Sequence, residues 1–191
     1  VVVMGIGSNL EECFLKSVRS LETGVCHLHH VKFDSWTESE LLDYIAQFRD
    51  DNIYAVMELL RRGVAIEKIH EVTMITEYFL ESFKRIVEME NKLKAHINDV
   101  SVLKEAKVMG ISDEYIGQLW NLTSYEVYKK RIENGIKPIF KMVDTLHTGK
   151  YIAYLYSSYT GENASRITDK KKIVVLGAGP IRIGQGVEFD Y

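Results

Sequence analysis

A glycine-rich segment near the end of the chain has the residue types that bind phosphate groups through backbone amides. Gly177 and Gly179 follow the apolar run 173–176, so we expect a buried strand to lead into a tight turn. N–H groups at such a turn favour anions. The dinucleotide-binding fingerprint has glycine where this chain has Arg182, and Pro180 lacks a backbone N–H group. We therefore interpret the segment as a strand-to-helix turn that opens an α/β unit.

A histidine tract and two cysteines are the other candidates for chemistry. Residues 27–30 include three histidines, but no further ligand nearby has the spacing of a metal site that needs four ligands. We therefore expect a surface loop there. Cys13 and Cys26 have no CxxC spacing and no cationic cluster that would make a reactive thiolate. Both are interpreted as packing residues, which is typical of a reducing, cytoplasmic setting.

The composition limits the classes of function. The chain has 191 residues, of which 46% are hydrophobic and 27% charged, with a net charge of -3. This balance is typical of a globular protein and gives no basic field for nucleic acid. No apolar run reaches the roughly 18 residues that could span a membrane. The sequence contains no catalytic triad, carboxylate pair or Walker loop, so we expect no active site in the chain itself.

The central part of the sequence predicts a series of helices. Asn9 is a candidate N-cap, and capping boxes start at Thr37 and Thr123, each with glutamate three residues on. Apolar residues, Phe48 and Phe79 among them, then recur at spacings of three and four, which indicates helices with one buried face. The charged residues Glu88, Glu90, Lys92 and Lys94 are interpreted as a solvated face. We expect about six to eight helices, beginning near residues 10, 37, 52, 65, 76, 100, 112 and 123.

Short β segments are expected on both sides of the helices. Residues 1–6 are predicted to form a strand, and 136–143, which contain Pro138, an edge strand or an extended segment. Residues 151–156 form an aromatic, β-prone segment. A polar linker, 160–172, follows. The predicted fold class is mainly α, with truncated α/β pieces at both ends. We therefore expect the chain to be a piece of a longer protein that joins larger units.

The order of these motifs resembles one family, the large subunit of carbamoyl phosphate synthetase. The most specific motif is Gly-Pro-x-Arg-Ile-Gly-Gln-Gly-Val-Glu-Phe-Asp-Tyr, which resembles the opening of the family's second synthetic unit. The resemblance implies the end of a first ATP-grasp unit at 1–23, a helical oligomerisation domain at 24–148, a connector at 149–171 and the start of the second unit at 172–191. The stretches that carry the match are 3–7, 11–22, 110–113, 135–138, 141–145, 154–159 and 177–191.

The resemblance also implies a parent reaction and its partners. The family makes carbamoyl phosphate from bicarbonate, ammonia released from glutamine by a small glutaminase subunit, and two ATP with Mg²⁺ or Mn²⁺. It serves arginine and pyrimidine biosynthesis. The resemblance places Gln185, Gly186 and Glu188 along the passage through which carbamate migrates, and it places no catalytic, cofactor or metal residue in this chain. Self-association through the helical domain is expected.

The sequence differs from the family at two positions, and two other functions would also fit it. The family commonly has arginine where this chain has Ser8, which puts an ionic role at that position in doubt, and it commonly has asparagine near Ile181. A free-standing helical interaction scaffold would also fit the helical pattern. A truncated nucleotide-binding enzyme would fit the glycine-rich turn. Binding of ATP by the chain would favour the truncated enzyme, whereas the connector predicts none.

Overall fold

The helices dominate the structure, a computed structural model that describes residues 3–144 and 149–176. In that part, eight α-helices and one 3₁₀ helix, η1, precede a small two-stranded sheet, which confirms the prediction of a mainly α fold. None of the described helices is long and apolar enough to cross a membrane. The elements are α1 (Leu10–Ser20), η1 (Val31–Phe33), α2 (Glu38–Ile45), α3 (Asn52–Arg61), α4 (Ile66–Thr73), α5 (Glu77–Ala95), α6 (Val100–Met109), α7 (Asp113–Trp120), α8 (Ser124–Glu133), β1 (Ile139–Met142) and β2 (Leu155–Ser158).

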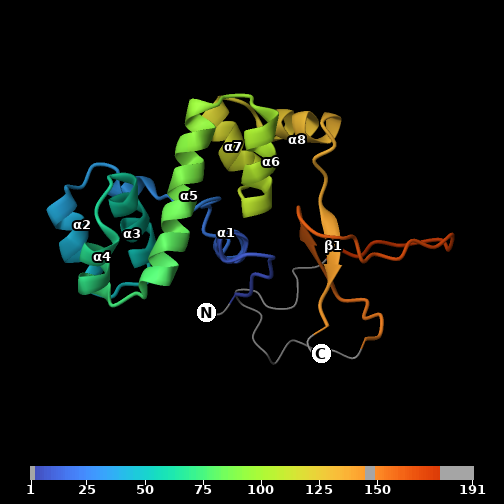
Figure 1. The fold of residues 1–191 in the computed structure, drawn as a ribbon, viewed down its shortest axis with the longest axis horizontal. Helices are drawn as coiled ribbons and strands as arrows, with labels where there is room; N and C mark the ends of the chain where they lie inside the picture. Colours follow the sequence, from blue (N-terminus) through green and yellow to red (C-terminus); the bar gives the residue numbers. More distant parts are fainter. Residues whose placement is uncertain (1–2, 145–148, 177–191) are drawn as a thin grey trace.

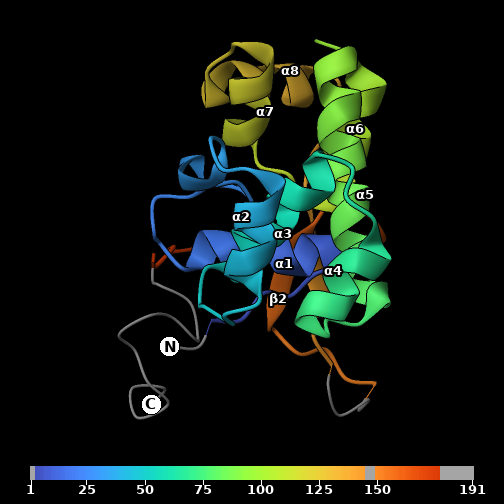
Figure 2. The same ribbon diagram turned by 90° about the vertical axis from the view of Figure 1, so that its left-hand side faces the viewer.

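The long helix α5 organises the helical body. Helices α3 and α4 contact it on one side and α6 and α7 on the other, so it separates two groups of short helices (Figure 1). Helix α1 contacts both α5 and α6, and α8 packs mainly on α7. Viewed from the side, α1 lies below α7 and α8 (Figure 2). The β-hairpin lies beyond the α6–α8 group, so the two groups of helices and the hairpin follow one another along the molecule.

The core follows the apolar stripe of α5. Leu80, Ile86 and Leu93 are fully buried on this helix, and Met57 of α3 is fully buried beside them in the same cluster. Each fully buried side chain of this size stabilises the fold by about 1.5–3 kcal/mol. Trp120 is also buried, and its indole N–H donates to the Leu93 carbonyl at 2.8 Å, which satisfies the one polar atom of the ring. The helical body therefore has one continuous core.

Capping interactions set several helix ends as the sequence predicts. Both capping boxes form: the hydroxyl of Thr37 accepts from the Glu40 N–H, and the hydroxyl of Thr123 accepts from the Glu126 N–H. In each box the glutamate carboxylate also accepts a hydrogen bond from the threonine backbone N–H at 2.7 Å. Asn9 caps α1 by accepting from the Glu12 N–H at 2.8 Å. Reciprocal bonds of this kind satisfy the free donors at a helix start.

Gly110 ends α6 at the point where the chain approaches α1 most closely. Its φ of 93° lies in the left-handed region, and a Cβ built on it would lie 2.8 Å from the Glu12 Cα atom. Any side chain at this position would therefore collide with the backbone of α1. Glycine is required here for conformation and for space, which fixes the α6–α7 turn against α1.

Three β predictions need correction. Residues 3–6 form no strand, because no strand lies beside them in the described part and the Ile6 carbonyl instead accepts from the Lys16 ammonium. The apolar run 173–176 is likewise neither strand nor buried, with Leu176 92% exposed, since its described neighbours offer no sheet to join. The second hairpin strand covers Leu155–Ser158 rather than 151–156, because it ends level with β1 in the register Ile139↔Ser158 to Met142↔Leu155.

Two aromatic side chains lie outside the core that the periodicity predicted for them. Phe48 is 71% exposed because α2 ends at Ile45, and Phe48 follows the helix with a left-handed φ of 50°. Phe79 lies on α5 but is partly exposed, and it packs edge-on against Phe14 of α1 with ring centroids 6.3 Å apart. Helical periodicity predicted a helix in both regions, but it did not indicate that α2 ends at Ile45.

Candidate functional site: the connector junction and two buried charge networks

The N-terminal segment, α1 and the hairpin meet at one place, which we call the connector junction. Glu12 and Lys16 lie one turn apart on α1, and Oε1 of Glu12 lies 2.9 Å from Nζ of Lys16. Glu12 is only 1% exposed. Its Oε2 accepts from the Ser8 backbone N–H at 2.6 Å and from the Ser158 hydroxyl at 3.2 Å. One buried carboxylate therefore holds the N-terminal segment, α1 and β2 together.

Both strands of the hairpin contribute to the connector junction. The Lys16 ammonium donates to the Ser157 carbonyl at 2.5 Å and lies 5.4 Å from the Tyr156 ring centroid. From the other strand, Lys141 donates to the Ser8 hydroxyl at 3.2 Å. These contacts join distant parts of the sequence, since 141 positions separate Lys16 from Ser157. The hairpin is thus attached to the helical body by charged hydrogen bonds, the stronger class of such bonds.

A first buried charge network joins α6, α7 and α8. Oδ1 of Asp113 lies 2.6 Å from the Lys107 ammonium, and Oδ2 accepts a hydrogen bond from Nε of Arg131 at 2.8 Å. Lys107 also donates to the Ile111 carbonyl at 2.7 Å. Lys107 and Arg131 lie 5.1 and 5.7 Å from the ring centroid of Tyr159, which follows β2. This network therefore reaches from three helices to the end of the hairpin.

A second network lies on the other side of α5. Glu90 is fully buried, and its carboxylate takes two hydrogen bonds from Arg61, at 2.8 and 2.9 Å. Nε2 of His27 lies 2.8 Å from Glu90 Oε1, and the imidazole stacks on the Tyr115 ring with centroids 3.7 Å apart. The loop before η1 is thereby tied to α3, α5 and α7. A neutral imidazole that donates from Nε2 fits this arrangement.

Two sequence-based interpretations are wrong at this network. His27 was expected in a surface loop, and Glu90 on a solvated face of α5, but both are buried. Both side chains can be buried because they form a hydrogen bond with each other. Arg61, from a third element, balances the negative charge of Glu90. No group of three His, Cys, Asp or Glu side chains in the described ranges could hold a metal ion.

The networks shift the pKa values of their members in directions that follow from burial and charge. Burial alone would raise the pKa of Glu90, but hydrogen bonds from Arg61 and His27 outweigh it and lower that pKa to about 2. Burial lowers the pKa of His27 and keeps the imidazole neutral. Burial also lowers the pKa of Lys107 to about 8, because attraction to Asp113 offsets only part of the desolvation.

The two cysteines are partly buried, and the nearby cations Lys16 and Arg19 do not outweigh the effect of that burial. Burial is the largest influence on both thiols and raises the pKa of Cys13 and of Cys26. A raised pKa keeps a thiol protonated and unreactive at neutral pH. Both residues therefore agree with the interpretation that they serve packing.

Sequence reasoning found few of the residues that meet at these sites. The residues expected along a carbamate passage, Gln185, Gly186 and Glu188, lie outside the described residues, as does the glycine-rich turn. The four-residue spacing of Glu12 and Lys16 was a visible signal for an ion pair on α1. Nothing local in the sequence indicated that Ser158 would complete it.

Comparison with family models decides which proteins this chain is related to. Residues 2–135 match the model for the carbamoyl-phosphate synthetase large chain, oligomerisation domain, over more than half of the chain. The chain belongs to this synthetase family. Residues 169–191 match a second model, the carbamoyl phosphate synthase preATP-grasp domain. Both matches confirm the resemblance found in the sequence motifs.

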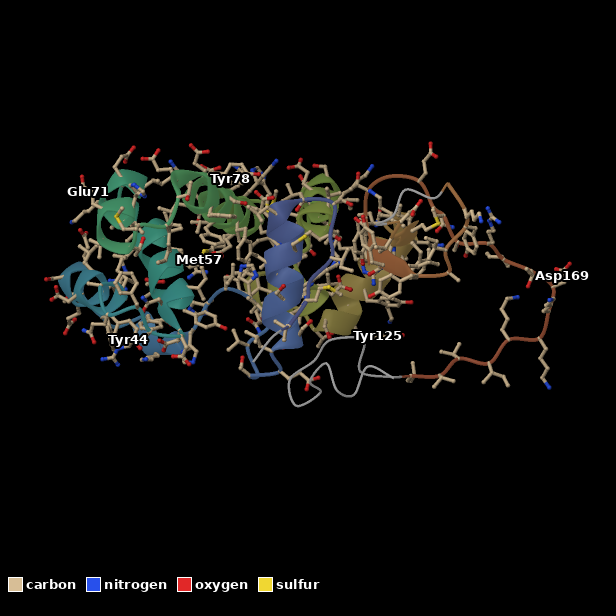
Figure 3. All side chains as sticks on the ribbon, turned by 90° about the horizontal axis from the view of Figure 1, so that it is seen from below. Tyr44, Met57, Glu71, Tyr78, Tyr125 and Asp169 are labelled. Carbon is tan, nitrogen blue, oxygen red and sulfur yellow. The ribbon has the colours of Figure 1, made fainter. Side chains whose placement is uncertain are left out.

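The two matches show where the hairpin lies in this synthetase chain. The first match contains all eight helices, both buried networks and the α1 side of the connector junction. Both strands of the hairpin lie after it and before the second match. An extended segment follows the hairpin, and Asp169, where the second match begins, lies at its far tip (Figure 3). The domain boundaries at residues 24, 149 and 172 remain predictions.

Proposed function

We propose that this chain is the assembly and connector part of an enzyme that makes carbamoyl phosphate from bicarbonate, glutamine-derived ammonia and two ATP. The match to the family's oligomerisation domain supports this role. The main support for the connector role is the position of Lys16. Its ammonium donates to the Ile6 carbonyl in the N-terminal segment and to the Ser157 carbonyl in the hairpin. A chain that joins two synthetic units needs such a fixed geometry between its incoming and outgoing segments.

The chemistry of the described charged groups supports a structural role. Glu12, Glu90 and Asp113 are each held by a cation at 2.6–2.9 Å. A catalytic base needs a pKa near the working pH and access to substrate. A carboxylate such as Glu90, with its pKa near 2 and no exposure, meets neither condition. We therefore propose that the chain alone is inactive.

The partners and cofactors of the parent enzyme belong to the same proposal. ATP with Mg²⁺ or Mn²⁺ would bind in ATP-grasp units, where the metal neutralises phosphate charge. A small glutaminase subunit would supply ammonia. The enzyme would work in the cytoplasm and feed arginine or pyrimidine biosynthesis.

Self-association would use an apolar surface at the α2 end of the helical body. Val31 is 73% exposed and Phe48 is 71% exposed. Their chain neighbours Lys32 and Arg49 both lie on Tyr44, at 4.6 and 4.7 Å from its ring centroid, so the two exposed side chains flank one aromatic cluster. Exposed apolar side chains around an aromatic centre are typical of interface cores. We name Val31 and Phe48 the α2-end patch.

The carbamate passage is proposed for residues beyond the described part. Gly186 would leave room for the intermediate, while Gln185 and Glu188 would offer it hydrogen bonds. A bulky residue in place of Gly186 should uncouple ATP consumption from carbamoyl phosphate output in the parent enzyme. Matched consumption and output in that variant would contradict the passage.

Calorimetry with Mg-ATP separates the connector role from a truncated nucleotide-binding enzyme. The purified chain should give no saturable heat on titration with Mg-ATP up to millimolar concentration. An intact ATP-dependent family member serves as the positive control under the same conditions. Saturable one-to-one binding by this chain would contradict the proposed role.

A further inference from the structure

A polar cavity lies between α1, the α6–α7 turn and the end of β2. Its volume is about 240 Å³, and its lining includes Glu12, Lys16, Arg19, Lys107 and Asp113. Backbone from Gly110 to Ser112 forms one wall, and Ser157 and Tyr159 form another. The cavity therefore touches both the connector junction and the first charge network. We call it the junction cavity.

The charges at the junction cavity do not balance. Lys16, Arg19 and Lys107 line it as cations, whereas Glu12 and Asp113 are its carboxylates. Glu12 pairs with Lys16, and Asp113 pairs with Lys107. Asp113 is further shared with a fourth cation, Arg131. The charged side chains of the lining therefore carry one excess positive charge, and a partly buried positive charge is costly unless an anion compensates it.

Arg19 is the lining cation that has no carboxylate partner inside the junction cavity, while Glu22 and Glu114 line a neighbouring pocket with it. In the described part its guanidinium makes one hydrogen bond, from Nη1 to the Gly110 carbonyl at 3.0 Å, and no ion pair. Burial is the largest influence on this group and lowers its pKa. A guanidinium carries five N–H donors in a fork that fits two oxygens of one anion. Most of that capacity is unused at the wall of a polar cavity.

We propose that the junction cavity binds a small oxyanion of the phosphate class, held by hydrogen bonds from Arg19 and attracted by the positive charges of Lys107 and Lys16. A phosphate would offset the excess positive charge of the lining, and two of its oxygens suit the paired donors of a guanidinium. The cavity is large enough for a phosphate or phosphoryl group. The bound anion would touch α1, the α6–α7 turn and β2 together, so it would tighten the hairpin on the helical body. This site does not depend on the proposed parent reaction.

Titration of the 191-residue chain with inorganic phosphate, followed by amide NMR, tests the site without any variant. Saturable shifts should appear at residues 110–113 and 157–159, at constant ionic strength held with chloride. AMP titrated in parallel identifies the source: tighter binding than phosphate indicates a nucleotide phosphoryl group, and weaker binding indicates free phosphate. Both results support the site. Shifts that do not saturate, or that spread over the basic surface, overturn it.

The variant Arg19→Met separates the junction cavity from general attraction to positive charge. Methionine keeps much of the stem but removes the donors, so phosphate affinity should fall at least about tenfold, as expected when a charged hydrogen-bonding group is lost. Arg49→Met, which also removes one positive charge but lies beside Gln47 on the surface, should bind phosphate like the original chain. Equal phosphate affinity in both variants would overturn the proposal. The circular dichroism of Arg19→Met confirms that the comparison is between folded proteins.

Discussion

Oε1 of Glu90 lies 2.8 Å from Nε2 of His27, and neither side chain is exposed by more than 1%. This pair joins the loop before η1 to the central helix α5, and Arg61 balances its charge from α3. Burial of an ion-paired group stabilises a fold only while every member keeps its partner. The pair therefore makes the helical body sensitive to pH and to the loss of one charge.

The stability of the chain should fall on acidification in two stages. The pKa of His27 is lowered by burial, so the unfolded state takes up a proton that the folded state resists once the pH drops below about 6.5. The folded pKa of Glu90 is about 2 against 4.5 when unpaired, so its contribution is complete above pH 4.5 and is lost from there to about pH 2. This second contribution is about 3 kcal/mol. Urea unfolding between pH 8 and pH 2 measures both stages.

A matched pair of variants on α5 isolates the contribution of Glu90. Glu90→Gln removes the carboxylate that takes two hydrogen bonds from Arg61, leaves only Glu58 among the described residues as its ion pair, at 3.6 Å, and should cost about 3–5 kcal/mol at pH 7. Glu88→Gln, an exposed position two residues earlier, should change the free energy of unfolding by less than about 0.5 kcal/mol. Glu90→Gln should also remove most of the decline below pH 4.5. Similar stabilities for the two variants would show that the buried pair does not stabilise the fold.

Alanine at Gly110 should destabilise the chain much more than alanine at Gly135. Both glycines have a left-handed φ, 93° and 72°, so both changes carry the same conformational cost of about 1 kcal/mol. Of the two positions, only Gly110 would bring the new Cβ against another backbone, at 2.8 Å from the Glu12 Cα, whereas at Gly135 no atom of the described residues beyond the adjoining ones lies within 4 Å. The collision should add about 1–3 kcal/mol. Thermal unfolding of both variants measures the difference, and equal losses would contradict the close approach of α6 and α1.

Removal of the Lys16 ammonium should loosen the hairpin without unfolding the helices. Lys16→Met loses the bonds to Glu12 and to the Ile6 and Ser157 carbonyls, so amides of residues 155–158 should exchange with solvent at least about tenfold faster. Helices α2 to α4 should keep their protection. Lys68→Met, which breaks an exposed pair with Glu38, is the matched control and should leave the hairpin unchanged. Uniformly faster exchange across the chain would contradict a local role for Lys16.

The helices could be predicted from the sequence because their signals are local. The signals are the capping boxes at Thr37 and Thr123 and the apolar spacing along α5, which involve residues only three or four positions apart. The start and the buried face of a helix can therefore be recognised from nearby residues alone. The networks could not be predicted, because Glu90 is paired by residues 63 and 29 positions away. A charged residue between Glu88 and Lys92 on a helix looks solvated until its partners are known. The same limit applies to Ser158, whose partner Glu12 is 146 positions away.

If the α2-end patch is the surface for self-association, the purified chain should assemble through Val31 and Phe48. Light scattering of the purified chain over a wide concentration range measures its mass directly. We predict a reversible rise from 22.0 kDa to at least a dimer, lost in the Val31→Glu and Phe48→Glu variants. Ile97→Glu, at a position that is also exposed but lies between α5 and α6, should assemble like the original chain. A mass of 22.0 kDa for the original chain at every concentration would contradict its role as an oligomerisation unit.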